Sequence, residues 1–115
     1  MKNQQLESLI TELKKTSIEQ DAKIWKRIAS DLERPTKQRR AVNLSRINRY
    51  AKANDTVVIP GKVLSMGSLN KKVTVAAYNF SKNAVDKIKD SGSNAITIKE
   101  LVKKNPKGAK VRIIG

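Results

Sequence analysis

Basic side chains without acidic neighbours mark one segment of this chain. Residues 34–54 contain seven lysines and arginines and no aspartate or glutamate. These residues are Arg34, Lys37, Arg39, Arg40, Arg46, Arg49 and Lys52. A solvated charged helix is one interpretation, but solvated surfaces usually mix charges of both signs. The exclusion of acids therefore favours the binding of phosphate groups, which guanidinium and ammonium groups contact readily.

The chain lacks most of the residues with which enzymes do chemistry. It has no cysteine and no histidine, which excludes thiolate nucleophiles, imidazole bases, disulfides and the common zinc sites. Gly61 and Gly67 do not match the phosphate-binding loops of nucleotide-dependent enzymes. Asp86 and Asp90 lie four residues apart with lysines between them, a pattern more typical of a solvated helix face. We therefore expect no enzymatic activity, no metal site and no cofactor.

The charge of the whole chain points to the same class of partner. Its 115 residues include 25 lysines and arginines against 10 acids, a formal net charge of +15. Residues 1–33 are neutral overall, whereas residues 55–115 carry +8. High charge alone could serve only solubility, but self-repulsion of this size disfavours a compact chain unless a polyanion neutralises it. A nucleic acid is the expected partner.

The neutral first third is predicted to form two helices. Its first apolar residues have the i, i+3, i+4, i+7 spacing of one helix face: Leu6, Leu9, Ile10 and Leu13. Ser17 and Gln20 match a capping box, which would start the second helix. That helix would bury Trp25 and end before Pro35, because proline disfavours helical geometry in the preceding residue.

The basic segment would begin as a loop or extended arm at residues 35–40 and continue as a short helix. Asn43 is positioned to cap that helix. Its buried side would consist of Leu44, Ile47 and Tyr50 or Ala51. Arg46 and Arg49 are three residues apart, so they would be neighbours on one positively charged helix face.

After residue 55 the apolar pattern changes to that of short strands. Strand-like runs occur at residues 57–59, where Pro60-Gly61 should end the strand, and at 73–80, 95–96 and 111–114. Both alternating sets of residues in 73–80 are largely apolar, which predicts a strand covered on both faces. Between these runs lie a helix capped by Ser81 and closed by Gly92, and a second helix that starts with a capping box at residues 97–100.

These patterns predict an α/β fold, a helical N-terminal section followed by a small irregular layer of short strands and helices. We expect a single domain, residues 1–115, because two pieces of this chain would each bury too small a core. Residues 1–54 would be helical, with the basic arm at 34–54, and residues 55–115 would form the α/β core.

The mode of nucleic-acid binding follows from what the sequence lacks. Neither the aromatic strand of an RNA-recognition motif nor a GxxG loop is present. With only four aromatic residues, of which Trp25 lies among core positions, stacking on bases cannot be the main mode. Backbone binding remains, in which lysines and arginines contact phosphates and the shape of the RNA sets the register. The N-terminus shows no signal peptide and no stretch is long enough to span a membrane, so we expect a soluble cytoplasmic protein.

Three phrases in register resemble one known family. They are LERPTKQRRAVNLSRI at residues 32–47, VIPGKVL at 58–64 and VTVAA at 73–77. Together they resemble the L-eighteen-e family of large-subunit ribosomal proteins, which archaea and eukaryotes share and which is related to bacterial protein L-fifteen. The resemblance covers nearly the whole chain, and its length is similar to the archaeal form.

The resemblance implies a structural constituent of the large ribosomal subunit that binds ribosomal RNA and supports translation without catalysis. Neighbouring ribosomal proteins are further implied partners, whereas a membrane or a small-molecule substrate is not. The candidate RNA-binding residues are Arg34, Lys37, Arg39, Arg40, Arg46, Arg49, Lys62, Lys71 and Lys72. Pro60-Gly61, beside Lys62, could equally be only a turn. A small basic DNA-binding protein of chromatin is the alternative, although no helix-turn-helix pair is evident.

Overall fold

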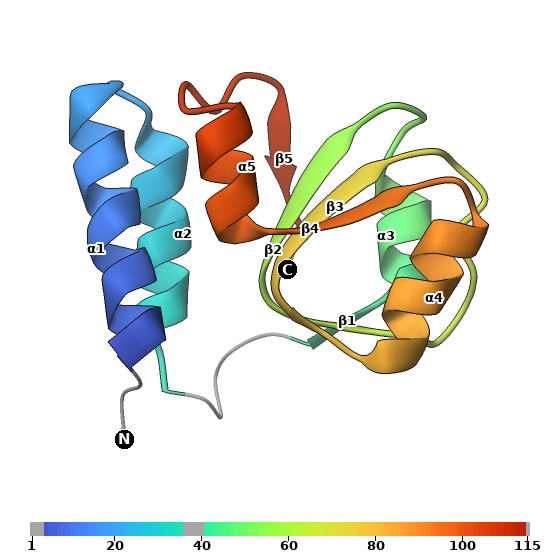
Figure 1. Ribbon diagram of the computed structural model, residues 1–115. Helices are drawn as coiled ribbons and strands as arrows, with labels where there is room; N and C mark the ends of the chain where they lie inside the picture. Colours follow the sequence, from blue (N-terminus) through green and yellow to red (C-terminus); the bar gives the residue numbers. More distant parts are fainter. Residues whose placement is uncertain (1–3, 36–40, 115) are drawn as a thin grey trace. The chain divides into compact units, whose positions relative to one another are not determined.

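A computed structural model describes residues 4–35 and 41–114 of the chain. Contacts within it separate two compact units (Figure 1). The first includes α1 (Gln4–Glu19), α2 (Lys23–Glu33) and most of α5 (Ile98–Lys104). The second contains the β-sheet with α3 (Leu44–Tyr50) and α4 (Lys82–Asp90). The predicted α/β class, with N-terminal helices before strands and helices, is confirmed.

Helices α1 and α2 lie side by side and bury their apolar faces (Figure 1). Of the four residues predicted to line one face of α1, Leu6, Ile10 and Leu13 are buried, and Leu9 is half-buried. The second helix buries Trp25 completely, and its indole Nε1 donates a hydrogen bond to the carbonyl oxygen of Pro106 at 2.7 Å. The interpretation of Trp25 as a core residue is therefore confirmed.

The predicted capping box at Ser17 is wrong. Helix α1 continues to Glu19, and the amide of Gln20 still donates to the carbonyl of Thr16 at 2.9 Å. Ser17 therefore has the helical conformation and cannot adopt the extended backbone of an N-cap. Helix α2 begins instead after Ala22, which supplies no side-chain cap. Its predicted end is confirmed, because it stops at Glu33, two residues before Pro35.

Every pairing between the described strands of the sheet is parallel. The central strand is β2 (Thr56–Leu64), with β3 (Thr74–Phe80) along one edge and β4 (Asn94–Thr97) beyond it. Along the other edge, β5 (Val111–Ile113) pairs with the first residues of β2 and β1 (Ala41–Asn43) with the last. The strands β1 and β5, which are far apart in the sequence, therefore pair with the two ends of the same long strand.

Two sequence-based expectations about this sheet are wrong. Pro60-Gly61 does not end the strand, since β2 runs through it to Leu64. The pairing with β3 shifts register between Ile59 and Lys62, and such an irregularity tolerates a proline that has no amide to donate. Residues 1–54 are also not purely helical, because Ala41–Asn43 forms β1. Pairing with the C-terminal half of β2 makes a strand of these three residues, which lie between the expected arm and the expected helix.

The core of the second unit lies between one face of the sheet and the helices α3 and α4. Alternate residues of β2 and β3 contribute Val57, Ile59, Val75 and Ala77, while the helices contribute Leu44, Ile47, Ala84 and Ile88. Ala76, on the opposite face of β3, is buried as well, as predicted for a strand covered on both faces.

Helix α4 has both of its predicted ends. Ser81 Oγ accepts the amide of Ala84 at 3.2 Å. At the other end, Gly92 has a φ of +81° and its amide donates to the carbonyl of Lys89, while Ser93 donates to Ile88. This is the Schellman arrangement, in which a glycine in the left-handed region closes the helix.

Candidate nucleic-acid interface

Helix α3 separates its apolar and basic residues onto opposite sides. Leu44, Ile47 and Ala51 are buried in the core of the second unit, whereas Arg46 and Arg49 are exposed, as their spacing predicted. Tyr50 differs from the expectation that it could share the buried side. Its neighbour Ala51 is 1% exposed and fills that place, and Tyr50 is 48% exposed.

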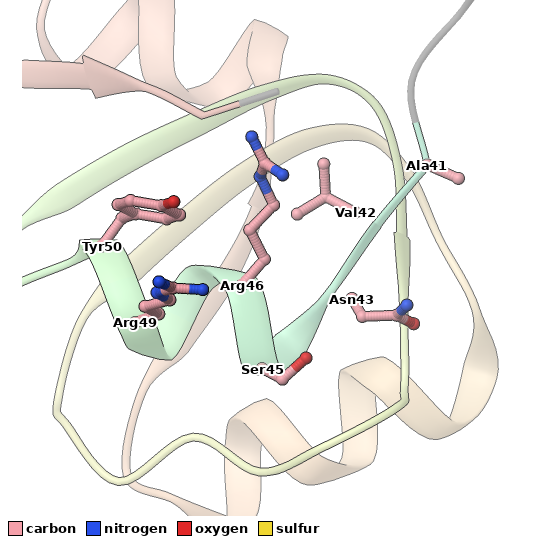
Figure 2. Close-up of a pocket in the computed structure, with 7 residues that line it drawn as sticks. All are labelled: Ala41, Val42, Asn43, Ser45, Arg46, Arg49 and Tyr50. Atoms are coloured by element: carbon pink, nitrogen blue, oxygen red, sulfur yellow. The ribbon is translucent and has the colours of Figure 1, made fainter.

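Tyr50 is the centre of a small cationic surface. The guanidinium carbons of Arg46 and Arg49 lie 5.5 and 5.6 Å from the centre of its ring, within the range of cation–π attraction. These three side chains border a hollow of about 420 Å³ between α3 and β1 (Figure 2). The rest of its lining comes from Ala41, Val42, Asn43 and Ser45, so no acidic group lines it.

No ion pair joins Arg46 or Arg49 to an acid in the described part of the chain. Two other arginines do have such partners, because Arg112 lies 3.8 Å from Asp55 and Arg34 lies 3.8 Å from Asp31. The positive charge of α3 therefore faces outward without a local counter-charge. Such a surface attracts anions.

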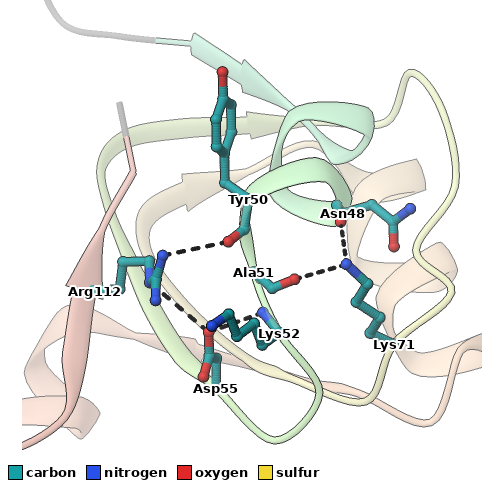
Figure 3. Close-up of polar contacts among 7 residues, drawn as sticks. All are labelled: Asn48, Tyr50, Ala51, Lys52, Asp55, Lys71 and Arg112. Atoms are coloured by element: carbon teal, nitrogen blue, oxygen red, sulfur yellow. Dashed lines mark hydrogen bonds and ion pairs between the residues drawn. The ribbon is translucent and has the colours of Figure 1, made fainter.

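Two cations hold the C-terminal end of α3 (Figure 3). The Lys71 ammonium donates to the carbonyl oxygens of Asn48 and Ala51, at 2.8 Å each. The Arg112 guanidinium donates to the carbonyl oxygen of Tyr50 at 3.5 Å. The last carbonyls of a helix lack partners within it and carry partial negative charge, so cations at this position stabilise it.

The loop between β2 and β3 holds the same helix from its side. Its Met66 carbonyl accepts the amide of Ser45 at 3.1 Å, and its Asn70 amide donates to Asn48 Oδ1 at 2.9 Å. Gly67 packs so tightly that a Cβ there would lie 2.6 Å from Cβ of Ser45. The basic helix is thus held by contacts along its whole length.

Asn43 was predicted to cap α3. Its position is as predicted, but the capping hydrogen bond is absent. Asn43 occupies the N-cap position with extended backbone, but its side chain makes no capping hydrogen bond. The residue is also the last of β1, so pairing with β2 already fixes its backbone. Asn43 is one of the residues that line the hollow.

The candidate RNA-binding residues have different environments. Lys37, Arg39 and Arg40 lie outside the described residues. Arg34 belongs to the first unit, directly after α2. Only Arg46 and Arg49, among the described candidates, line the hollow beside α3.

The three candidate lysines all belong to the second unit. Lys62 is exposed on β2, where it pairs in register with Ala41 of β1, and Lys72 is exposed before β3. Lys71 is half-buried because its ammonium group is used inside the fold. Sequence reasoning missed this use of Lys71 and the exposure of Tyr50. Neither has a local signal. The bonds of Lys71 reach residues 20 and 23 positions away, and the exposure of Tyr50 depends on which side chain fills the core.

Metal-binding clusters and membrane-spanning helices are both absent from the described part of the molecule. Within residues 4–35 and 41–114, no group of three or more acidic, histidine or cysteine side chains could hold a metal ion. None of the described helices has the length and apolar character that a membrane span requires.

The fold and its arginine-bearing helix define a small basic α/β protein with an anion-attracting face. Comparison with known families identifies it further. The chain matches the family described as ribosomal protein 60S L18 and 50S L18e over residues 2–115. It belongs to this family, which is the one that the three sequence phrases resemble.

Curated archaeal relatives support the assignment along the whole chain. The chain is 50% identical over 112 residues to a protein of Methanoregula boonei, covering 97% of this chain and 93% of that protein. It is 46% identical over 109 residues to one of Halobacterium salinarum, covering 95% and 93%. A protein of Archaeoglobus fulgidus is 45% identical over 112 residues, covering 97% and 96%. All three bear the name large ribosomal subunit protein eL18.

Proposed function

We propose that this chain is a structural, non-enzymatic constituent of the large ribosomal subunit in the cytoplasm, where it supports translation. Its family and the names of its relatives support this role. Large-subunit ribosomal RNA would be its main partner, together with neighbouring ribosomal proteins. A net charge of +15 on 115 residues matches a phosphate-rich partner.

The RNA would be bound mainly through its phosphate backbone, with the exposed face of α3 as the central contact. The observation that carries this proposal is the pair of guanidinium groups of Arg46 and Arg49, which have no acidic partner among the described residues. Arginine presents several N–H donors in one plane and binds phosphate oxygens in pairs. The firm anchoring of α3 would hold both groups ready before the RNA arrives.

Other basic residues would extend this contact. Lys62 and Lys72 are exposed in the same unit as α3. Arg34, Lys37, Arg39 and Arg40 precede it in the acid-free segment. Lys71 would act differently, since its two hydrogen bonds to α3 carbonyls assign it to positioning the helix.

The salt dependence of binding tests this proposal. The Arg46→Gln/Arg49→Gln variant and the wild-type chain would be titrated with large-subunit RNA over a series of salt concentrations. The slope of log K against log salt is negative. Each phosphate that the variant no longer neutralises should reduce the magnitude of this slope by roughly 0.7–0.9, using values for single strands and B-DNA. The affinity should fall with it. Glutamine keeps polarity, and circular dichroism would check that α3 persists.

The Lys103→Gln/Lys104→Gln variant is the matched control, because it removes the same charge from an exposed pair at the end of α5. Its decrease in slope should be smaller. Equal decreases in the two variants would show that net charge alone drives binding and would overturn the assignment to α3. Preference for duplex DNA over ribosomal RNA would favour the chromatin alternative instead.

A further inference from the structure

The hollow beside α3 has chemistry that a phosphate site alone does not need. Tyr50, which lines it, is 48% exposed, whereas Trp25 is fully buried and Tyr78 and Phe80 are half-buried. An aromatic face beside two guanidinium planes is the surface on which nucleic-acid bases stack. From this geometry we propose that the hollow binds the base of one unpaired nucleotide, stacked against Tyr50, with its phosphate on Arg46 and Arg49.

The size and lining of the hollow match a single nucleotide. Its volume of about 420 Å³ lies within the usual range of roughly 300–1,000 Å³ for small-molecule sites. Val42 adds an apolar side chain to this lining, whereas the side chain of Ala41 points away from Tyr50 (Figure 2). An apolar side chain offers no hydrogen bond to a phosphate ion, but it can pack against a base.

Polar groups are present for the edge of the base. Asn43 and Ser45 are among the residues that line the hollow, and the side chain of Asn43 is not used to cap α3. Strand β1 stands at the margin of the sheet and pairs only with β2 among the described strands, which leaves one edge of its backbone toward the outside. Amide and backbone groups are the partners with which proteins bind base edges in single-stranded RNA.

Tyr50 and the two arginines would contact different parts of the nucleotide. Arg46 and Arg49, which lie over the ring by cation–π attraction, would turn toward the negative charge of the backbone and leave a face of the ring to the base. Tyr50 would contribute stacking, which releases no counterions because the ring is neutral. This inference rests on the proposed function, and the different salt dependence of the two contributions separates their tests.

A mononucleotide provides the first test on the intact chain. Adenosine monophosphate and ribose 5-phosphate would be titrated at equal ionic strength while the ring protons of Tyr50 are followed by NMR, with Tyr78→Phe used to assign them. Both probes carry a phosphate, but only the first carries a base. We expect an upfield shift of the Tyr50 ring signals with adenosine monophosphate alone. Equal responses to both probes would reveal an anion site and overturn the inference.

Ribosomal RNA provides the second test. Tyr50→Leu should weaken binding of large-subunit RNA by roughly 5- to 150-fold, the effect of removing one stacked base, with the salt slope unchanged. Tyr50→Phe keeps the ring and should bind nearly as tightly as the wild type. Circular dichroism would verify that both variants fold, which the exposure of Tyr50 favours.

The combined outcomes distinguish the two proposals. If Tyr50→Leu binds as the wild type does while Arg46→Gln/Arg49→Gln lowers the slope, the proposed function stands and the stacking inference falls. A lowered slope in Tyr50→Leu would mean that the ring only positions the arginines, which also overturns stacking. If none of the variants alters binding, both proposals fall.

Discussion

The ammonium nitrogen of Lys71 lies 2.8 Å from the carbonyl oxygen of Ala51, the C-cap residue of helix α3. A second bond of the same length reaches Asn48. Lys71 and Lys72 are adjacent, yet of these two lysines only Lys71 donates such bonds to residues in the described part of the chain, and Lys72 is exposed. Two neighbouring lysines of equal charge therefore have different roles, one inside the fold and one at its surface.

Replacing Lys71 should destabilise the free protein. Lys71→Met keeps the apolar stem but removes both charge-assisted hydrogen bonds, at an expected cost of about 1–3 kcal/mol in the free energy of unfolding. Lys72→Met removes the same charge from the exposed neighbour and should change stability by less than about 0.5 kcal/mol. Urea unfolding followed by circular dichroism measures both. Equal stabilities would contradict the helix-capping role of Lys71.

Gly67 should be intolerant of any side chain. It has a φ of +91°, and an added Cβ would lie 2.6 Å from Cβ and 2.8 Å from the amide nitrogen of Ser45. Gly67→Ala should therefore cost about 1–3 kcal/mol for the left-handed backbone, with the clash added to it, and should loosen α3. Gly92→Ala is the control, because its φ of +81° is similar but its Cβ would come no closer than 3.4 Å to a flexible lysine. A smaller destabilisation for Gly67 than for Gly92 would refute the packing argument.

The buried face of α1 should determine the stability of the first unit. Leu13 is 0% exposed, and truncating such a leucine usually costs about 2–5 kcal/mol. Leu9→Ala should cost less, because Leu9 is only half-buried. Ile18→Ala on the same helix should be nearly neutral, since Ile18 is 83% exposed. Thermal or urea unfolding of the three variants gives the order, and a large destabilisation for Ile18 would contradict it.

The single tryptophan tests whether the chain unfolds as one domain, which stays a prediction of its length. Trp25 belongs to the first unit, so its fluorescence follows that unit. The β-sheet belongs to the second unit, and backbone circular dichroism follows both. A single cooperative domain would give coincident transitions by the two probes. Separate midpoints would instead mean that the two units unfold independently.

Local patterns in the sequence were enough for several features of the fold. The ends of α4 follow from Ser81 and Gly92, because capping hydrogen bonds join residues only a few positions apart. Pro35 indicated the end of α2 because proline restricts the backbone of the residue before it. The spacing of Arg46 and Arg49 placed both on one helix face. Net charge and the three family phrases pointed to the ribosomal family independently of any structure.

Features that depend on distant partners were decided by the tertiary structure alone. Ala41–Asn43 becomes a strand because β2 offers an edge there, and β2 passes Pro60-Gly61 because a register shift absorbs the missing amide. Ala51 rather than Tyr50 fills the core, which leaves the ring exposed beside the arginines. The sequence by itself determined which chemistry the chain carries, since residue types and local spacing are written in it. Only folding decided which charges face outward, because burial and hydrogen bonding depend on residues brought together from far along the chain.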